Sequence, residues 1–304
     1  MNFKIHFNTI LFFFNFKILS FAPMSLFITS LNSGSNGNCY YVGNETEAVL
    51  IDVGISCREV EKRMKRLGLL MQNIKAVFIS HEHSDHIYGL CGLVKKYCLP
   101  VYITEATMQN GKLTFDRALV KVFVAHEPVL IGNLSVIAFP KFHDAADPYS
   151  FVVECEKVSV GIFTDIGKAC KNVIGYFKQC HAAFLEANYD EDMLRSGNYP
   201  FYLKKRISGG MGHLSNNEAL DIFIRHRPPF MSHLFLSHLS KNNNSPELVQ
   251  KIFDAHAGNV QIIVASRYNE TSIFRICADP LPRKIAAHTI IKKSRSTQLS
   301  FEFA

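Results

Sequence analysis

The stretch Ala76-Val77-Phe78-Ile79-Ser80-His81-Glu82-His83-Ser84-Asp85-His86 joins an apolar run to three histidines and an aspartate. The apolar run predicts a buried strand, and imidazole and carboxylate groups placed at its end need polar partners there. A divalent metal ion supplies such partners, and this order of nitrogen and oxygen donors suits one. A solvated polar loop is the alternative, but a surface loop does not require this particular order of nitrogen and oxygen donors. The stretch therefore predicts a metal-dependent hydrolase.

The length and composition of the chain fit a globular protein with one large α/β domain or two modest ones. Of its 304 residues, 48% are hydrophobic and 19% are charged, which is normal for a soluble protein. The formal net charge is +7, of which residues 1–23 carry +2 and residues 277–304, with five basic and two acidic side chains, carry +3. A basic balance suits a polyanionic partner without identifying one.

The cysteines predict a reduced chain. None of the eight belongs to a C-x-x-C pair, and several lie in apolar runs. This usage favours a cytoplasmic protein over a disulfide framework, and we assign no cysteine to the metal.

Residues 1–23 have a basic start and the apolar run Ile10-Leu11-Phe12-Phe13-Phe14, so an export signal is one interpretation. Asn15 and Lys17 interrupt the apolar run, no small-x-small cleavage site follows, and the segment is too short and too polar to span a bilayer. Met24 directly precedes a strand-like run, so we expect translation to start there and no stable membrane association. The chain then divides into a disordered or mispredicted extension (1–23), a body (24–276) and a basic tail (277–304).

The hydrophobic pattern of the body predicts strands and helices in both halves. We expect strands near residues 26–31, 39–42, 48–53, 76–79, 101–103, 119–124, 134–141, 149–155, 158–163, 183–186, 234–237, 260–264 and 272–276. We expect helices near residues 57–67, 86–97, 168–177, 215–225 and 246–256. Strands first, then mixed strands and helices, favour a layered α/β/β/α sandwich over a doubly wound parallel sheet.

Three further residues, each of a type that can bind a metal, follow a strand-like stretch: His143, Asp165 and His238. Taken alone, each also fits an ordinary capping or loop residue. Strand ends on one edge of a sandwich can converge on a single cleft. Together with the opening stretch, these residues therefore form a complete set for two metal ions.

The H-x-H-x-D-H string at residues 81–86 resembles the motif of the metallo-β-lactamase fold superfamily. This resemblance implies an α/β (α+β) fold, a four-layer αββα sandwich, with seven metal ligands: His81, His83 and His143 for the first ion, Asp85, His86 and His238 for the second, and Asp165 as the bridge. Asp52 matches the early aspartate that orients the motif loop. Two ions about 3.5–4 Å apart can share a hydroxide as the nucleophile. The nitrogen and oxygen ligands accommodate zinc, manganese or iron.

Spacing between the ligands excludes some relatives. The interval from Asp165 to His238 is 73 residues, which is too short for the inserted domain of the β-CASP nucleases. The interval from His143 to Asp165 is 22 residues, which leaves no room for the long arm of RNase Z enzymes at its usual place. A compact, single-domain member of the superfamily remains.

Four strings between about residues 25 and 276 resemble the YycJ (also WalJ or VicX) family: Ser33-Gly34-Ser35-Asn36-Gly37-Asn38-Cys39, His143-Asp144-Ala145-Ala146-Asp147-Pro148, Gly212-His213-Leu214-Ser215-Asn216 and Ser237-His238-Leu239-Ser240-Lys241. The combination is specific to that family. It implies a cytoplasmic metal-dependent nuclease that cleaves phosphodiester bonds, with 5′→3′ exonuclease action on duplex DNA in DNA repair.

His213 and Glu186 are candidate catalytic residues, together with the ligand Asp85. His213 resembles the histidine of the H-S-T string of RNase Z enzymes, and Glu186 the glutamate of their H-E-A-T string. The resemblance implies that the pair relays a proton to the leaving oxygen, because an imidazolium oriented by a carboxylate can neutralise a basic alkoxide. A helix-entry histidine and an ordinary strand-end carboxylate are the alternatives.

Several side chains near the ligands are candidates for contact with the phosphates of a nucleic acid, although a solvated charged face explains them equally well: Lys204, Lys205, Arg206, Lys241 and Asn243. The end of the tail resembles the peptide with which bacterial DNA-repair proteins bind the sliding clamp. The clamp-binding candidates are Gln298, Leu299, Phe301 and Phe303, and an edge strand packed on the body is the alternative.

Other functions share this fold. An RNA nuclease or a small-molecule ester, lactone or thioester hydrolase would use the same metals, and a regulatory protein would use the fold without turnover. The basic strings and the clamp-like tail favour a nucleic acid as the substrate, and RNA remains an alternative to DNA. Because all seven ligand positions are filled, loss of activity is disfavoured.

Overall fold

The structure, a computed structural model, describes residues 25–278. The strands are β1 (Leu26–Asn32), β2 (Cys39–Gly43), β3 (Ala48–Ile51), β4 (Ile74–Phe78), β5 (Val101–Tyr102), β6 (Val120–Lys121), β7 (Pro128–Ile131), β8 (Leu134–Pro140), β9 (Tyr149–Cys155), β10 (Val158–Phe163), β11 (Ala182–Glu186), β12 (His233–Ser237), β13 (Gln261–Val264) and β14 (Phe274–Ile276). The α-helices are α1 (Cys57–Arg66), α2 (Ser84–Ile87), α3 (Leu90–Tyr97), α4 (Glu105–Asn110), α5 (Lys171–Phe177), α6 (Glu191–Ser196), α7 (Phe201–Ser208), α8 (Asn216–His226) and α9 (Pro246–Asp254).

The strands form two seven-stranded sheets with the same internal plan. The first has the order β14-β1-β2-β3-β4-β5-β6, and the second has the order β13-β12-β11-β10-β9-β8-β7. In each sheet one half is antiparallel and the other is parallel, with the change at β3 in the first sheet and at β10 in the second. The parallel halves place several strand ends side by side, which is where ligands bind in α/β folds.

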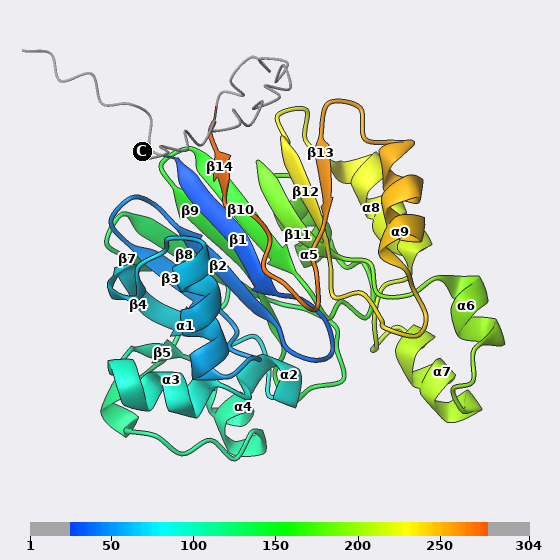
Figure 1. Cartoon of the computed structure of the whole chain (residues 1–304). Helices are drawn as coiled ribbons and strands as arrows, with labels where there is room; N and C mark the ends of the chain where they lie inside the picture. Colours follow the sequence, from blue (N-terminus) through cyan, green and yellow to red (C-terminus); the bar gives the residue numbers. More distant parts are fainter. Residues whose placement is uncertain (1–24, 279–304) are drawn as a thin grey trace, which may run out of the picture.

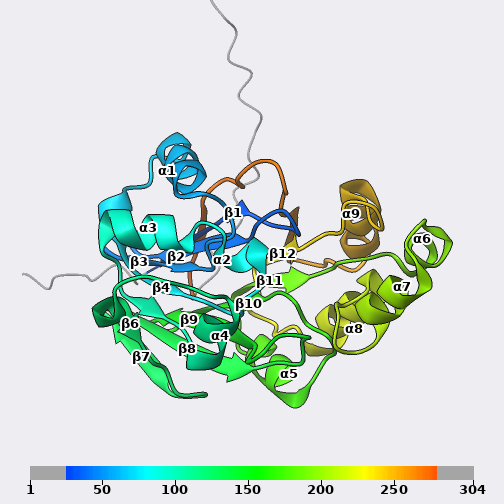
Figure 2. The same ribbon diagram turned by 90° about the horizontal axis from the view of Figure 1, so that it is seen from below.

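Three apolar clusters define four layers (Figures 1 and 2). Buried side chains of both sheets, such as Phe78, Phe151 and Phe184, fill the space between the sheets. A second cluster packs α1 and α3 on the outer face of the first sheet, and a third packs α5, α8 and α9 on the second. Each fully buried aromatic or aliphatic side chain stabilises the fold by about 1.5–3 kcal/mol. The predicted αββα sandwich is confirmed.

The register of the sheets carries the predicted ligands to one edge. Phe163, Leu185 and Leu236 are partners across β10, β11 and β12, so the residues that follow these strands lie at the same end of the second sheet. In the first sheet Ile51 pairs with Phe78, which places the turns after β3 and β4 beside each other.

The structure corrects the helix predicted near residues 86–97. It is divided into α2 and α3, and the break lies at Gly89, whose N–H donates to the carbonyl of Val53 at 2.8 Å. A Cβ atom at this position would lie 1.8 Å from the carbonyl oxygen of Ile55. Only glycine therefore permits this close approach of the two backbones.

Four of the α-helices and strands are not predicted by the sequence pattern: α4, β7, α6 and α7. Helix α7 has no buried residue, so its sequence lacks the apolar stripe that marks a packed helix. Figures 1 and 2 show α6 and α7 projecting from the body beside α8. They form a short arm that the sequence did not predict.

Some predictions fall outside the described residues. These are the extension 1–23, nearly all of the tail 277–304, and the clamp-binding candidates Gln298, Leu299, Phe301 and Phe303. Within residues 25–278, none of the helices combines the length and the apolar character needed to cross a bilayer.

Candidate metal centre

Three histidines from two separate loops form the first group of donor atoms. Nε2 of His81 lies 3.1 Å from Nδ1 of His83, and that Nδ1 lies 3.3 Å from Nε2 of His143. Nitrogens bound to one tetrahedral zinc ion at 2.0–2.1 Å would lie about 3.3 Å apart. The spacing of the three nitrogens therefore fits a shared divalent ion.

A second group brings together a nitrogen or oxygen atom from Asp85, His86, His238 and Asp165. Nε2 of His238 lies 3.3 Å from Oδ2 of Asp85, and Nε2 of His86 lies 3.1 Å from Oδ2 of Asp165. Oδ2 of Asp165 is buried and forms an ion pair with His86 that lacks the geometry of a regular hydrogen bond. Buried nitrogen and oxygen donors packed this closely are costly unless a cation joins them, and a divalent metal ion would satisfy them.

The carboxylate of Asp165 lies between the two groups. Its Oδ2 faces His86 of the second group, and its Oδ1 lies 3.8 Å from Nε2 of His143 in the first. The structure thus places all seven predicted ligands around one point, and this donor set fits two divalent ions.

Hydrogen bonds to the opposite ring nitrogens orient three of the histidines. Nδ1 of His86 lies 2.7 Å from Oδ2 of Asp52, Nδ1 of His143 lies 3.0 Å from the carbonyl oxygen of Gly212, and Nδ1 of His238 lies 3.0 Å from Oε1 of Glu186. Each acceptor accepts a hydrogen bond from Nδ1–H, which directs Nε2 toward the donor cluster, where it can bind a metal.

Asp52 has the position that its predicted orienting role requires. Besides its contact with His86, its carboxylate accepts hydrogen bonds from the N–H and the hydroxyl of Ser80, both at 2.8 Å. Asp52 does not continue β3, as the sequence suggested, because it has a φ of +60°. Asp165 and His238 share this left-handed conformation, with φ of +55° and +56°. Such strain in residues other than glycine persists where surrounding contacts impose it, and it concentrates at functional sites.

Asn38 and Gly54 hold the motif loop, although sequence reasoning gave neither a role at the site. The N–H of Asn38 donates to the carbonyl of Asp85 at 2.7 Å, and its Nδ2 lies 3.2 Å from Oδ2 of Asp85 and 3.1 Å from Nε2 of His86. A Cβ atom on Gly54 would lie 1.7 Å from the carbonyl oxygen of Asp85. The glycine- and asparagine-rich string around Asn38 was the available signal, but it reads equally well as a β-turn.

The buried charges polarise the cluster. Burial alone would lower the pKa of His86, but the carboxylates of Asp165, Asp52 and Asp85 outweigh it and raise this pKa to about 10. Burial would likewise lower the pKa of His238, yet Asp165 raises it well above its usual range. In the first group burial lowers the pKa of His143 to about 4. Burial also lowers the pKa of His81, so His81 and His143 favour the neutral form that binds a metal, whereas His86 and His238 favour the protonated form.

Glu186 and His213 are paired, as their predicted joint role requires. Oε1 of Glu186 lies 2.8 Å from Nδ1 of His213, and its Oε2 accepts the N–H groups of Ile166 at 2.6 Å and Leu214 at 3.3 Å. Burial would raise the pKa of Glu186, but His213 and His238 lower it to about 2. The side chain of His213 is 22% exposed, and Nε2 is the ring nitrogen left for the cleft.

A cleft of about 180 Å³ opens onto His213 and His238, whereas Glu186 lies buried behind them. Helix α7 contributes one wall, where Arg206 forms an ion pair with Asp144, the residue after the ligand His143. The predicted basic string therefore reaches the metal centre through Arg206.

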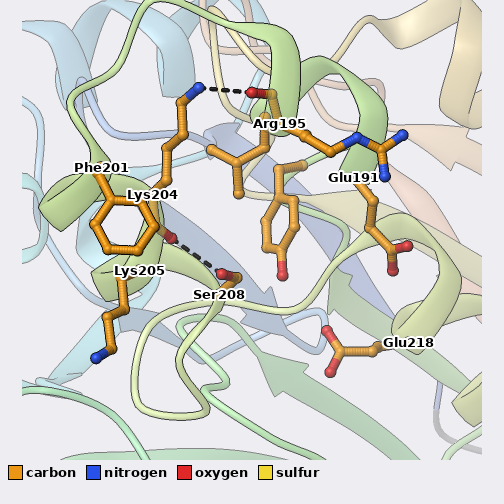
Figure 3. A pocket seen from close by; sticks show the side chains of 9 residues that line it. Glu191, Arg195, Phe201, Lys204, Lys205, Ser208 and Glu218 are labelled. Atoms are coloured by element: carbon orange, nitrogen blue, oxygen red, sulfur yellow. Dashed lines mark hydrogen bonds between the residues drawn. The ribbon is translucent and has the colours of Figure 1, made fainter.

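Lys204 and Lys205 face a different cavity, which measures about 800 Å³ (Figure 3). It lies between α6, α7 and the start of α8, and Nζ of Lys204 donates to the carbonyl of Arg195 at 2.7 Å. Glu191 and Glu218 also line this cavity. The two lysines and Arg206 therefore lie on different sides of α7, and their contact with phosphates stays a prediction.

The other predicted substrate contacts also separate. Lys241 is exposed, whereas Asn243 is only 1% exposed and its N–H donates to the hydroxyl of Ser240 at 3.3 Å. A side chain this buried cannot reach a phosphate, so Asn243 instead supports the loop after His238.

Comparison with known proteins gives one matching family, two similar relatives and one similar solved structure. A family described as "Beta-lactamase superfamily domain" matches residues 47–238, more than half of the chain. "Exodeoxyribonuclease YycJ" of Bacillus anthracis is 34% identical over 232 residues, which cover 75% of this chain and 87% of the relative. "Exodeoxyribonuclease WalJ" of Streptococcus pneumoniae is 32% identical over 223 residues, which cover 72% of this chain and 83% of that relative. Among solved structures, the metallo-beta-lactamase fold protein YhfI from Bacillus subtilis aligns with a TM-score of 0.64 at 16% identity, covering 83% of this chain and 99% of that one.

Proposed function

This chain belongs to the beta-lactamase superfamily and is a hydrolase, and we propose that it is an exodeoxyribonuclease that degrades duplex DNA from the 5′ end in the cytoplasm. The observation that carries the proposal is the pair formed by His213 and Glu186 at the edge of the seven-donor cluster. The two relatives named exodeoxyribonucleases support DNA as the substrate.

The cluster would hold two divalent ions, with zinc, manganese and iron all compatible with its nitrogen and oxygen donors. His81, His83 and His143 would bind one ion, Asp85, His86 and His238 the other, and Asp165 both. Bound there, the ions would generate a nucleophile from water at neutral pH and stabilise charge on the attacking and leaving oxygens.

Side chains of the protein would donate the proton, attract the substrate and orient a metal ligand. Glu186 fixes the Nδ1 proton of His213, so that a protonated Nε2 donates to the leaving alkoxide of the phosphodiester. Arg206, on the wall of the same cleft, would attract the phosphate backbone. Asp52 keeps His86 aligned through the contact between Oδ2 and Nδ1.

The test uses metal-loaded protein and three substrates: duplex DNA labelled at either end, labelled RNA, and a chromogenic carboxylic ester. We expect early release of the 5′ label as short products and progressive shortening of the 3′-labelled strand. Cleavage of RNA in preference to DNA would redirect the proposal to RNA. Ester hydrolysis without DNA cleavage would overturn it.

We further propose that residues 24–276 form the catalytic body and that the tail carries a sliding-clamp peptide through Gln298, Leu299, Phe301 and Phe303, which would place the enzyme in DNA repair. The sequence string supports this second proposal. Calorimetric titration of a purified bacterial clamp with the full chain tests it, with Leu299→Ala/Phe301→Ala as the variant expected to lose binding.

A further inference from the structure

A third cavity, of about 290 Å³, adjoins the metal cleft. Ser240 lines both hollows. In addition, Nη2 of Arg267, in the lining of this cavity, donates to the hydroxyl of Ser35, in the lining of the cleft, at 3.0 Å. These two links make the cavity, which we call the flanking pocket, a neighbour of the chemistry.

The charge of the flanking pocket is positive. Its lining includes Lys241 and Arg267 but no carboxylate. The guanidinium of Arg267 donates to neutral oxygens of Ser35 and Asn36, which leave its charge uncompensated. Helix α9 begins at Pro246 in the same lining, and the start of a helix adds a partial positive charge. The cavity in Figure 3 differs in this respect, because Glu191 and Glu218 line it.

An exposed aromatic ring stands beside these cations. Tyr268 is 64% exposed, yet its backbone is fixed at both ends. Its carbonyl accepts from Nη2 of the buried Arg63 at 3.0 Å, and its N–H donates to the hydroxyl of Ser266 at 3.0 Å. A fixed loop that presents an exposed ring next to positive charge has the features of a platform for stacking a nucleobase.

We propose that the flanking pocket binds a nucleotide adjacent to the scissile one, with its phosphate on Lys241 and Arg267 and its base on Tyr268. Lys241 follows the ligand His238 by three residues, so their Cα atoms lie within about 11 Å of each other. This short distance is what binding of a nucleotide adjacent to the scissile one requires. A base must be unpaired to stack on Tyr268, so the bound segment is single-stranded. This inference rests on the proposed nuclease function.

The variants Tyr268→Ala and Lys241→Gln test the pocket, since both side chains are exposed and their loss leaves the core intact. Tyr268→Phe keeps the ring. Lys157→Gln, in the exposed turn between β9 and β10, is the matched charge control. The readouts are the Kd for a fluorescent phosphorothioate single strand of about twelve nucleotides, the hydrolysis of bis(p-nitrophenyl) phosphate, and the melting temperature.

We expect Tyr268→Ala to weaken oligonucleotide binding at least about fivefold, since stacking on an aromatic ring contributes about 1–3 kcal/mol per base. Lys241→Gln should weaken binding and flatten its salt dependence. Tyr268→Phe and Lys157→Gln should bind the oligonucleotide and hydrolyse the small diester like the wild type, whereas Tyr268→Ala and Lys241→Gln should lose more oligonucleotide binding than diester hydrolysis. The proposal would be overturned if Tyr268→Ala and Lys241→Gln both bound the oligonucleotide like the wild type, or if they lost diester hydrolysis to the same extent as binding. If the wild type cleaves the diester but neither binds nor cleaves nucleic acid, the proposed function itself fails.

Discussion

Oε1 of Glu186 lies 2.8 Å from Nδ1 of His213 and 3.0 Å from Nδ1 of His238. One buried oxygen therefore orients both a proposed proton donor and a proposed metal ligand. The two histidines differ in what their free Nε2 atoms face, since that of His238 lies 3.3 Å from Oδ2 of Asp85, whereas His213 opens onto the cleft. Substitutions at His213 and Glu186 should separate proton transfer from metal binding.

His213→Ala should lower kcat about 10²- to 10⁴-fold, which is the usual contribution of a general acid, while the metal content stays unchanged. Glu186→Gln should lower both kcat and metal content, because its amide cannot accept all the hydrogen bonds that now orient His213 and His238. Steady-state kinetics and elemental analysis of the purified proteins measure both effects. Loss of metal in His213→Ala would show that His213 is itself a ligand.

Asp165→Asn should abolish turnover and reduce the bound metal. An amide carries no charge and offers one oxygen where the carboxylate offers two to the two donor groups. Asparagine tolerates the left-handed φ of +55° at this position, so the backbone should keep its conformation. The melting temperature of the metal-free protein should fall, because the buried His86 and His238 lose a compensating charge. Asp144→Asn, next to His143 but outside the donor groups, is the control and should keep its metal.

The sequence predicted the sandwich and its ligand set because both depend on short-range patterns. His143, Asp165 and His238 each follow a buried strand, and a polar donor directly after an apolar run is visible without knowledge of the fold. The register of the second sheet then brings the ends of β8, β10 and β12 to the same edge.

Contacts between segments that are distant in the sequence leave no such pattern, so the sequence could not predict them. Asn38 reaches Asp85 across 47 residues, and its own surroundings read as an ordinary turn. The arm formed by α6 and α7 buries few of its residues, so no periodic apolar signal marked it. The division of Lys204, Lys205 and Arg206 between two cavities likewise depends on how α7 lies against the body.

Gly54→Ala should disturb the metal centre although Gly54 bears no functional group. The added Cβ would lie 1.7 Å from the carbonyl oxygen of Asp85 and 2.5 Å from the N–H nitrogen of Asn38, so the motif loop has to shift. Loss of contacts that support the metal ligands lowers metal affinity by about 10- to 100-fold. Titration with zinc against a chromogenic chelator measures the loss. Gly175→Ala, which meets no atom within 4 Å, is the matched control and should bind zinc like the wild type.

Metal binding should release protons and tighten as the pH rises. In the metal-free protein the pKa of His86 is raised to about 10, and that of His238 is raised as well, so both are protonated at neutral pH and must lose a proton to bind a metal. The apparent affinity should therefore increase by at least about tenfold per pH unit between about pH 6 and 8. Because folding raises these pKa values, the interactions of His86 and His238 with the neighbouring carboxylates stabilise the metal-free fold below about pH 6.5. This contribution to stability is lost as the pH rises through about 10. Calorimetry in buffers of different ionisation enthalpy counts the protons, and a heat independent of buffer would contradict the prediction.

Arg206→Gln and Lys205→Gln should affect DNA binding unequally, although the two residues are adjacent in the sequence. Arg206 lines the metal cleft, whereas Lys205 lines the cavity on the other side of α7. Loss of one phosphate contact should weaken binding for every sequence and reduce the slope of log Kd against log salt by about one, so we expect this change for Arg206→Gln and a smaller one for Lys205→Gln. Hydrolysis of bis(p-nitrophenyl) phosphate, which spans a single phosphate, should change less than DNA cleavage in both variants. Equal salt slopes for the two variants would show that DNA contacts both sides of α7, and would place the cavity of Figure 3 on the substrate path.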